Sequence, residues 1–317
     1  MTPQHASKAI ILFKIFLIGL FIISLSPLFA QTQHSSELQI TSDNDSYTLR
    51  GKDGYYTNGL KISFRWKNKK DSSSKIIHSI EIGQLMYNSK NGSYQYLYEL
   101  DRPVTAFLYG SYTQTNFTKK EDVFRWNVML GTIGPPAFGR QVQEAIHSTL
   151  GMYKPEEWQF QLKTEVGLNG NFEWSPNVQN LSSNISVKPI AGLSIGNTFT
   201  NANAGAAMLF GKFNNNSNSV FWDANLNSNQ KESFFYIYPQ IIAKAYDATV
   251  QGGLFRHGKN KGEYIGRLNR AVFLPKIGWM YSNKGFLLGL ALSYESKESL
   301  TQIESQFYGT ISLGFDL

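Results

Sequence analysis

Apolar and polar residues alternate along most of this chain, most clearly between positions 60 and 66. Successive strand residues point to opposite faces, so this segment predicts a β-strand with one apolar and one polar face. The apolar face carries Leu60, Ile62, Phe64 and Trp66, and the polar face carries Lys61, Ser63 and Arg65. Similar alternation predicts further strands over residues 76–82, 124–130, 188–198, 204–213, 234–246, 249–255, 272–281, 286–294 and 307–317.

Polar stretches such as residues 67–74 and 214–219 separate these segments and indicate turns or exposed loops. In a soluble sandwich or lipocalin-like barrel, the apolar faces would meet a core. In an outer-membrane barrel, they would meet lipid while the polar faces line the lumen. We predict an all-β fold, a transmembrane antiparallel up-and-down β-barrel of about 12 strands. The last strand ends at the chain terminus, where pairing would close the barrel and leave no edge.

The first 30 residues have the composition of a secretory signal peptide. Lys8 and Lys14 precede an apolar run over residues 15–23, and Ala30 ends a small-residue cleavage site. We therefore predict a signal peptide at residues 1–30 and one outer-membrane β-barrel domain at residues 31–317. The alternative is a membrane-anchoring helix, but an uninterrupted span needs about 20 apolar residues.

Composition and charge agree with export to the outer membrane of a Gram-negative bacterium. Aromatic residues make up 14% of the chain and charged residues 17%, as is typical of barrels whose alternating strands hide their lipid-facing residues. The absence of cysteine excludes disulfides, thiolate metal sites and thiolate nucleophiles. The formal charge of +7 falls to +5 once the two lysines of residues 1–30 are removed. A net positive charge suits contact with anionic lipid headgroups. We expect a monomer that contacts outer-membrane lipids and does not bind nucleic acid.

One segment, residues 138–151, has helical rather than strand spacing. Pro135 and Pro136 stop the strand before it, and Gly151 is placed to act as a C-cap. Between barrel strands, such a short helix belongs to an extracellular loop. We expect it to dock through an apolar stripe that consists of Val142, Ile146 and Leu150.

Gln143 and His147 lie four residues apart on this helix and therefore share a face, distinct from the apolar stripe. His147 is the strongest candidate for a general base, because imidazole is the side chain that titrates near neutrality. An ordinary surface histidine and an ordinary exposed glutamine are the alternatives.

The polar residues before position 60 are the other candidate site. Asn44 and Asp45 lie at a strand end, where Asx residues often cap a turn, and Thr57 lies in the next strand. The oxygens of residues 43–45 suit a hard cation such as calcium, although the spacing is not that of an EF-hand loop. The chain has no Gly-x-Ser-x-Gly elbow and no phosphate-binding loop. Residue chemistry alone thus predicts a hydrolytic site without a substrate.

An ordered set of motifs supplies a family context. Along the chain the motifs are Asn44-Asp45-Ser46, residues 53–60, Asp101-Arg102-Pro103, Leu108-Tyr109, Gly134-Pro135, Gln141-Val142-Gln143, His147, Trp158, Gln161-Leu162, Glu304 and residues 307–313. This set spans nearly the whole mature chain and resembles the outer-membrane lipid A 3'-O-deacylase (LpxR) family. The chain departs from the family pattern in two ways. Lys90 is only the nearest counterpart of a loop lysine, and Val104-Thr105-Ala106-Phe107 replaces a small residue followed by glycine.

The resemblance implies an antiparallel barrel whose active site lies near the extracellular membrane boundary, between the barrel wall and a loop helix. It implies a calcium-dependent hydrolase that removes the 3'-linked acyloxyacyl group of lipid A in lipopolysaccharide, without a covalent acyl-enzyme. In this interpretation His147 deprotonates a water that attacks the ester, and calcium held partly by Asp45 stabilises the oxyanion. Asn44, Thr57 and Gln143 would position the ion, the water or the ester.

Two other functions remain open on sequence alone. A non-catalytic barrel, either a pore or a structural protein, gives no reason for Asn44, Asp45 and His147 to occur together. An outer-membrane phospholipase of the serine type would need an activated serine with a histidine partner, and no such motif is evident.

Overall fold

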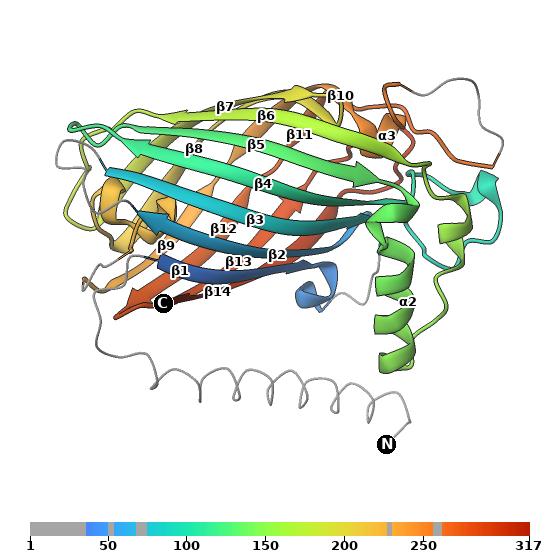
Figure 1. The fold of residues 1–317 in the computed structure, drawn as a ribbon, viewed down its shortest axis with the longest axis horizontal. Helices are drawn as coiled ribbons and strands as arrows, with labels where there is room; N and C mark the ends of the chain where they lie inside the picture. The colour runs from blue at the N-terminus through green and yellow to red at the C-terminus, as the bar shows by residue number, and fades with distance from the viewer. Residues whose placement is uncertain (1–35, 50–53, 68–74, 227–229, 256–261) are drawn as a thin grey trace.

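The computed structural model describes residues 36–49, 54–67, 75–226, 230–255 and 262–317, and the predicted signal peptide lies outside them. The described part is a closed antiparallel barrel with 12 strand positions and a few short helices (Figure 1). This confirms the predicted fold class. Within these ranges, no helix is both long enough and apolar enough to cross a membrane.

The wall consists of 14 strands in 12 positions, because two positions are each filled by two strands in succession. β9 (Glu232–Tyr238) continues into β10 (Gln240–Asp247), and β11 (Ala271–Phe273) continues into β12 (Lys276–Asn283). A proline lies at each break, where it withholds the N–H that a strand inside a sheet would donate. The other strands are β1 (Ser36–Asn44), β2 (Tyr56–Lys67), β3 (Lys75–Tyr87), β4 (Thr105–Phe117), β5 (Val123–Ile133), β6 (Glu165–Ser175), β7 (Ile185–Gly196), β8 (Phe199–Lys212), β13 (Phe286–Glu295) and β14 (Gln306–Asp316).

The C-terminal strand closes the barrel, as its alternation predicted. β14 pairs with β1 in antiparallel register, from Leu38 opposite Phe315 to Asn44 opposite Gly309. On its other side β1 pairs with β2. The first and last strands therefore leave no unpaired edge.

The outer face of the barrel is apolar and exposed. On β2, Leu60 is 45% exposed and Ile62 is 47% exposed, while Ile82 on β3 reaches 68%. Lys61 and Arg65 of the same β2 point the other way and line the lumen. A soluble barrel would bury such an apolar face, whereas a membrane barrel presents it to lipid. The predicted assignment of the two β2 faces is confirmed.

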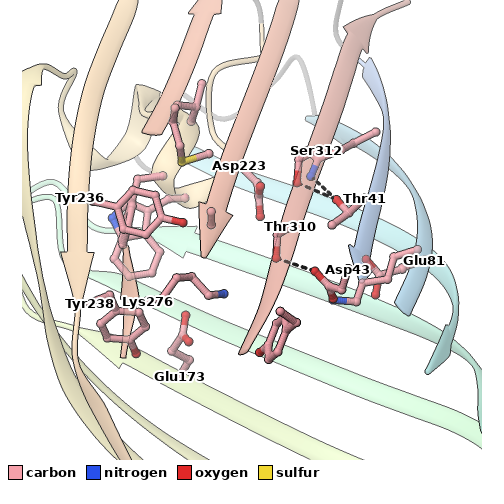
Figure 2. A pocket seen from close by; sticks show the side chains of 18 of the residues that line it. Thr41, Asp43, Glu81, Glu173, Asp223, Tyr236, Tyr238, Lys276, Thr310 and Ser312 are labelled. Carbon is pink, nitrogen blue, oxygen red and sulfur yellow. Dashed lines mark hydrogen bonds and ion pairs between the residues drawn. The ribbon is translucent and has the colours of Figure 1, made fainter. Parts of the chain in front are cut away.

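The lumen holds a polar cavity of about 560 Å³. Figure 2 shows side chains from opposite walls facing this space, among them Asp43, Glu81 and Lys276. Asp43 accepts hydrogen bonds from Tyr56, Lys61 and Thr310. The cavity lies inside the barrel, and none of the five predicted site residues lines it. The predicted site therefore lies outside this cavity.

The two ends of the barrel differ. At the terminal end, where β1 begins and β14 ends, the hairpin between β12 and β13 is only two residues long. At the other end, called the α2 end, lie α2 (Gly139–Leu150), α3 (Ala248–Gln251) and the 3-10 helices η2 (Asp45–Thr48), η3 (Leu97–Glu99), η4 (Pro135–Ala137) and η5 (Glu156–Phe160) (Figure 1).

The strand predicted over residues 249–255 is wrong, because Ala248–Gln251 forms helix α3 and the residues up to 255 form no strand. Asp247 ends β10, and its carboxylate accepts the Thr249 N–H at 2.9 Å. An aspartate in this position satisfies a backbone donor that a helix start would otherwise leave unpaired. The N-cap therefore turns the chain out of the wall immediately after β10.

The connection between β8 and β9 folds back into the lumen at the terminal end. It carries η6 (Asn216–Asn218) and η7 (Val220–Trp222). Trp222 is 2% exposed and packs in the apolar cluster that also contains the strand residues Ile77 and Phe234. Asp223 forms ion pairs with Arg65 at 3.1 Å and with Arg125 at 3.5 Å. This connection, residues 213–226, is a plug across the terminal end of the lumen.

The plug predicts that the intact barrel does not conduct ions. Trp222→Ala removes a buried ring, at a cost of about 3–5 kcal/mol, and Asp223→Ala breaks both ion pairs. We expect the double variant to show single-channel conductance in planar bilayers that the unmodified protein lacks. Lys212→Ala, at an exposed position at the end of β8, is the matched control. Steady conductance of the unmodified protein would contradict the plug.

Candidate active site

The five predicted site residues all lie at the α2 end of the barrel. There α2 lies at a steep angle to the strands, beside their ends, and contacts β3 and β4 (Figure 1). Gly139 begins the helix because the wall leaves no room for a larger residue. A Cβ at that position would lie 2.4 Å from the Trp158 ring and 2.5 Å from Ala106. Gly151 ends the helix with φ of +67°, a conformation that glycine adopts without strain.

The docked side of α2 is polar, so the predicted apolar docking stripe is wrong. Gln143 and His147 are each 4% exposed, whereas Ile146 is 40% exposed. Val142 packs only partly against the wall. The physical reason is that the wall supplies hydrogen-bond partners for Gln143, and a buried amide needs such partners. The prediction that Gln143 and His147 share a face is confirmed.

Thr57 reaches the site through a β-bulge in β2. The pairing of β2 with β3 shifts between Tyr56 and Asn58, which leaves Thr57 as the extra residue. The Thr57 hydroxyl donates to Asn88 Oδ1 at 2.7 Å, while the neighbouring Tyr56 hydroxyl bonds Asp43 inside the lumen. The bulge therefore turns Thr57 toward α2.

Asn88 joins the wall to the helix. Its Nδ2 donates to Gln143 Oε1 at 3.0 Å and also to Glu157 Oε1. Trp158 Nε1 donates to the same Gln143 oxygen at 2.5 Å. Two donors on one oxygen fix the orientation of the Gln143 amide. Sequence reasoning missed Asn88 and Glu157; the only available signal was that Glu157 precedes the family-motif residue Trp158.

The His147 ring is held in one orientation. Its Nδ1 donates to the Tyr153 carbonyl oxygen at 2.8 Å, since a carbonyl can only accept. The Tyr153 ring packs edge-on at 4.8 Å between centroids. In the neutral imidazole the lone pair therefore lies on Nε2, the atom that a general base would use.

Asn44 and Asp45 lie at the adjoining end of β1. Asn44 is paired with Asn58 across β1 and β2, and its Oδ1 accepts the Ser46 N–H at 2.8 Å. Asn44 thus caps η2, as the simpler alternative expected. Asp45 is 7% exposed, and its Oδ2 accepts the Gly54 N–H at 2.9 Å.

Asp101 ties three loops together beside the site. It accepts hydrogen bonds from Tyr55 at 2.7 Å, from Ser89 at 2.7 Å, and from the backbone of Lys90 and Ile303 at 2.9 Å. Burial and the bond to Asp101 raise the pKa of Tyr55, so this phenol stays a donor at ordinary pH. Tyr55 N also donates to Ser89 O. The Asp45 segment is thereby fixed to the loop that carries Asn88.

Arg102 anchors the same loops from the lumen side. It is fully buried, pairs with Glu298 at 2.8 Å, and lies 4.4 Å from the Tyr87 ring centroid. Burial alone would raise the pKa of Glu298, but Lys244 and Arg102 outweigh burial and lower it. The Asp101-Arg102-Pro103 motif is therefore a scaffold for the site.

The donor set suits a hard cation only in part. Within the described ranges, no group of three or more His, Cys, Asp or Glu residues could hold a metal ion. Calcium, however, also accepts amide, hydroxyl, backbone and water oxygens. Asp45 carries a carboxylate, and Asn44 and Thr57 carry neutral side-chain oxygens of the kind that calcium accepts. The chemistry fits calcium with Asp45 as the charged ligand.

The Asn88 hub makes a testable prediction. Asn88→Ala removes the donor shared by Gln143 and Glu157 and should destabilise this region by about 1–3 kcal/mol. We expect faster hydrogen exchange over α2 and η5, with an unchanged barrel. Asn91→Ala, in the same loop, is the control, and equal exchange in the two variants would contradict the role of Asn88.

Comparison with known proteins decides the family. The family described as "Outer membrane protein LpxR" matches residues 15–317. The chain belongs to the LpxR family. No curated protein sequence matches it. The solved structure "LpxR from Salmonella typhimurium" has a TM-score of 0.72 at 20% identity, over 89% of this chain and 100% of that chain. The beta domain of the Bordetella autotransporter BrkA follows with a TM-score of 0.46 at 9% identity, over 90% and 100%.

LpxR membership confirms the resemblance and the outer-membrane barrel that the sequence predicted. The low identity to the Salmonella structure means that this likeness shows the fold alone. The catalytic and binding roles of the five predicted site residues stay predictions. These residues are Asn44, Asp45, Thr57, Gln143 and His147.

Proposed function

We propose that this protein is a calcium-dependent lipid A deacylase that hydrolyses the 3'-linked acyloxyacyl ester of lipopolysaccharide. The observation that carries the proposal is the fixed His147 ring, whose Nδ1 bond to Tyr153 leaves the lone pair on Nε2. LpxR membership supports the substrate class. We take the α2 end as the outer side, since outer-membrane barrels carry their longer loops there.

The proposed chemistry is direct hydrolysis. His147 Nε2 takes a proton from water, and the hydroxide attacks the ester carbonyl. The tetrahedral intermediate then expels the sugar oxygen, which receives the proton back from His147. The products are the released acyloxyacyl acid and a sugar hydroxyl. Gln143, held by Asn88 and Trp158, and Thr57 orient the water or the ester.

Calcium bound at Asp45 would supply a Lewis acid for the oxyanion. Asn44 would either bind the calcium ion through its amide oxygen or act indirectly, because it caps η2, the short helix that begins with Asp45. The Gly54 bond keeps the Asp45 carboxylate in one orientation. These contacts act before the reaction, so their effect is preorganisation.

An assay of the acids that purified protein releases from lipopolysaccharide and from phospholipid vesicles separates this proposal from its alternatives. With calcium, lipopolysaccharide should yield acyloxyacyl product while phospholipid vesicles yield none. Fatty acid released from phospholipid alone would favour a phospholipase. No release from either, in a folded barrel, would favour a structural protein, because the plug already argues against a pore.

A further inference from the structure

α2 has three chemically different sides. At about 100° per residue, positions 139, 143 and 147 form the buried side already described. A polar side carries an ion pair between Arg140 and Glu144 at 2.8 Å, together with the exposed Ser148. The third side, called the apolar flank, consists of Val142, Ala145, Ile146 and Thr149.

The apolar flank needs no water to satisfy its polar atoms. The Thr149 hydroxyl donates to the Ala145 carbonyl at 2.8 Å, within the helix itself. Ile146 is 40% exposed although it is the largest apolar residue of the flank. A helix side whose one hydroxyl is bonded within the helix and whose aliphatic groups are exposed suits a lipid environment.

Contacts at both edges of α2 leave most of the flank uncovered. The returning chain covers the opposite edge, where Tyr153 holds His147 and Trp158 holds Gln143. On the flank's own edge, Val142 packs against a cluster that contains the wall residue Ala106. The other three residues of the flank are exposed.

The wall below the flank is the lipid-facing surface. Along β3, Ile80 is 50% exposed and Ile82 is 68% exposed, and then Met86 falls to 1% under the site. Between them, Gln84 Nε2 donates to the Ala137 carbonyl at 2.5 Å and fixes the start of α2. The helix thus begins where the lipid-facing surface ends, and Figure 1 shows it at a steep angle to the strands, beside their ends.

We propose that the apolar flank of α2 inserts into the acyl-chain region of the outer leaflet. A helix at a steep angle to the strands of a membrane barrel lies close to the membrane plane, and insertion would place its polar side toward water and its apolar side toward hydrocarbon. The flank continues the lipid-facing surface of the barrel, which identifies lipid as its partner. The site behind α2 then opens at the level of the acyl chains. This inference rests on the membrane barrel and not on the proposed hydrolysis.

Spin labelling tests the insertion directly, because the natural chain has no cysteine. Single variants Ile146→Cys, Ser148→Cys and Ile82→Cys would each carry a nitroxide in phosphatidylcholine vesicles. We expect position 146 to match position 82, with high accessibility to oxygen and low accessibility to a water-soluble nickel chelate. Position 148 should show the reverse.

The remaining outcomes overturn the proposal. Nickel accessibility at position 146 equal to that at position 148 would place the flank in water. Low accessibility to both reagents at 146 would mean that protein covers it. Circular dichroism and heat-modifiable migration of each labelled variant verify that the barrel is folded, so loss of folding cannot imitate either result.

Discussion

His147→Ala should lower lipid A deacylation by about 10²–10⁴-fold, the range that a general base contributes. His147 lies on α2, outside the strands, and the pairing of β1 with β14 closes the barrel without it. We therefore expect an unchanged barrel, measured by heat-modifiable migration, and a lost reaction, measured by release of acyloxyacyl product from lipopolysaccharide.

Two variants make this result specific. Ser148→Ala changes the next residue on the polar side and should retain activity. His147→Gln keeps a hydrogen-bonding side chain but cannot take up the proton, so it should be as inactive as His147→Ala. Activity retained in either His147 variant would remove the base assignment.

Removal of calcium should have the second-largest effect. A Lewis acid contributes several kcal/mol, and about 3 kcal/mol corresponds to roughly a hundredfold in rate. We expect a chelator to abolish hydrolysis and added calcium to restore it. Asp45→Asn should raise the calcium concentration needed for half-maximal activity, because it removes the one carboxylate of the donor set.

A matched acidic residue controls for general charge effects. Glu99→Gln lies in η3, where its carboxylate caps the helix backbone, and should leave the calcium requirement unchanged. Full activity in chelator, or an equal calcium requirement in Asp45→Asn and the unmodified protein, would contradict calcium binding at Asp45.

Much of the fold followed from period-2 alternation, because a lipid-facing and a lumen-facing side impose it directly. The pattern predicted the faces of β2 and the closing role of β14. It failed for residues 249–255, where Asp247 caps a helix that alternation cannot reveal. It also gave no warning of the plug, because residues 214–219 were predicted to be a turn or exposed loop, whereas Asn216 and Ser219 are buried.

The site was predicted less completely than the fold. Spacing placed Gln143 and His147 on one face, but it assigned docking to the apolar stripe, since buried polar partners such as Asn88 lie far away in sequence. The bulge that turns Thr57 toward the helix is a register shift, which depends on β3 as much as on β2. Such features come from tertiary contacts.

Tandem mass spectrometry of lipid A from cells that express the protein tests the central claim most directly. We predict the loss of one acyloxyacyl group, located at the 3' position by fragmentation, in cells with the unmodified protein and not in cells with His147→Ala. Lipid A of identical mass in both strains, or a loss at another position, would contradict the proposed deacylation.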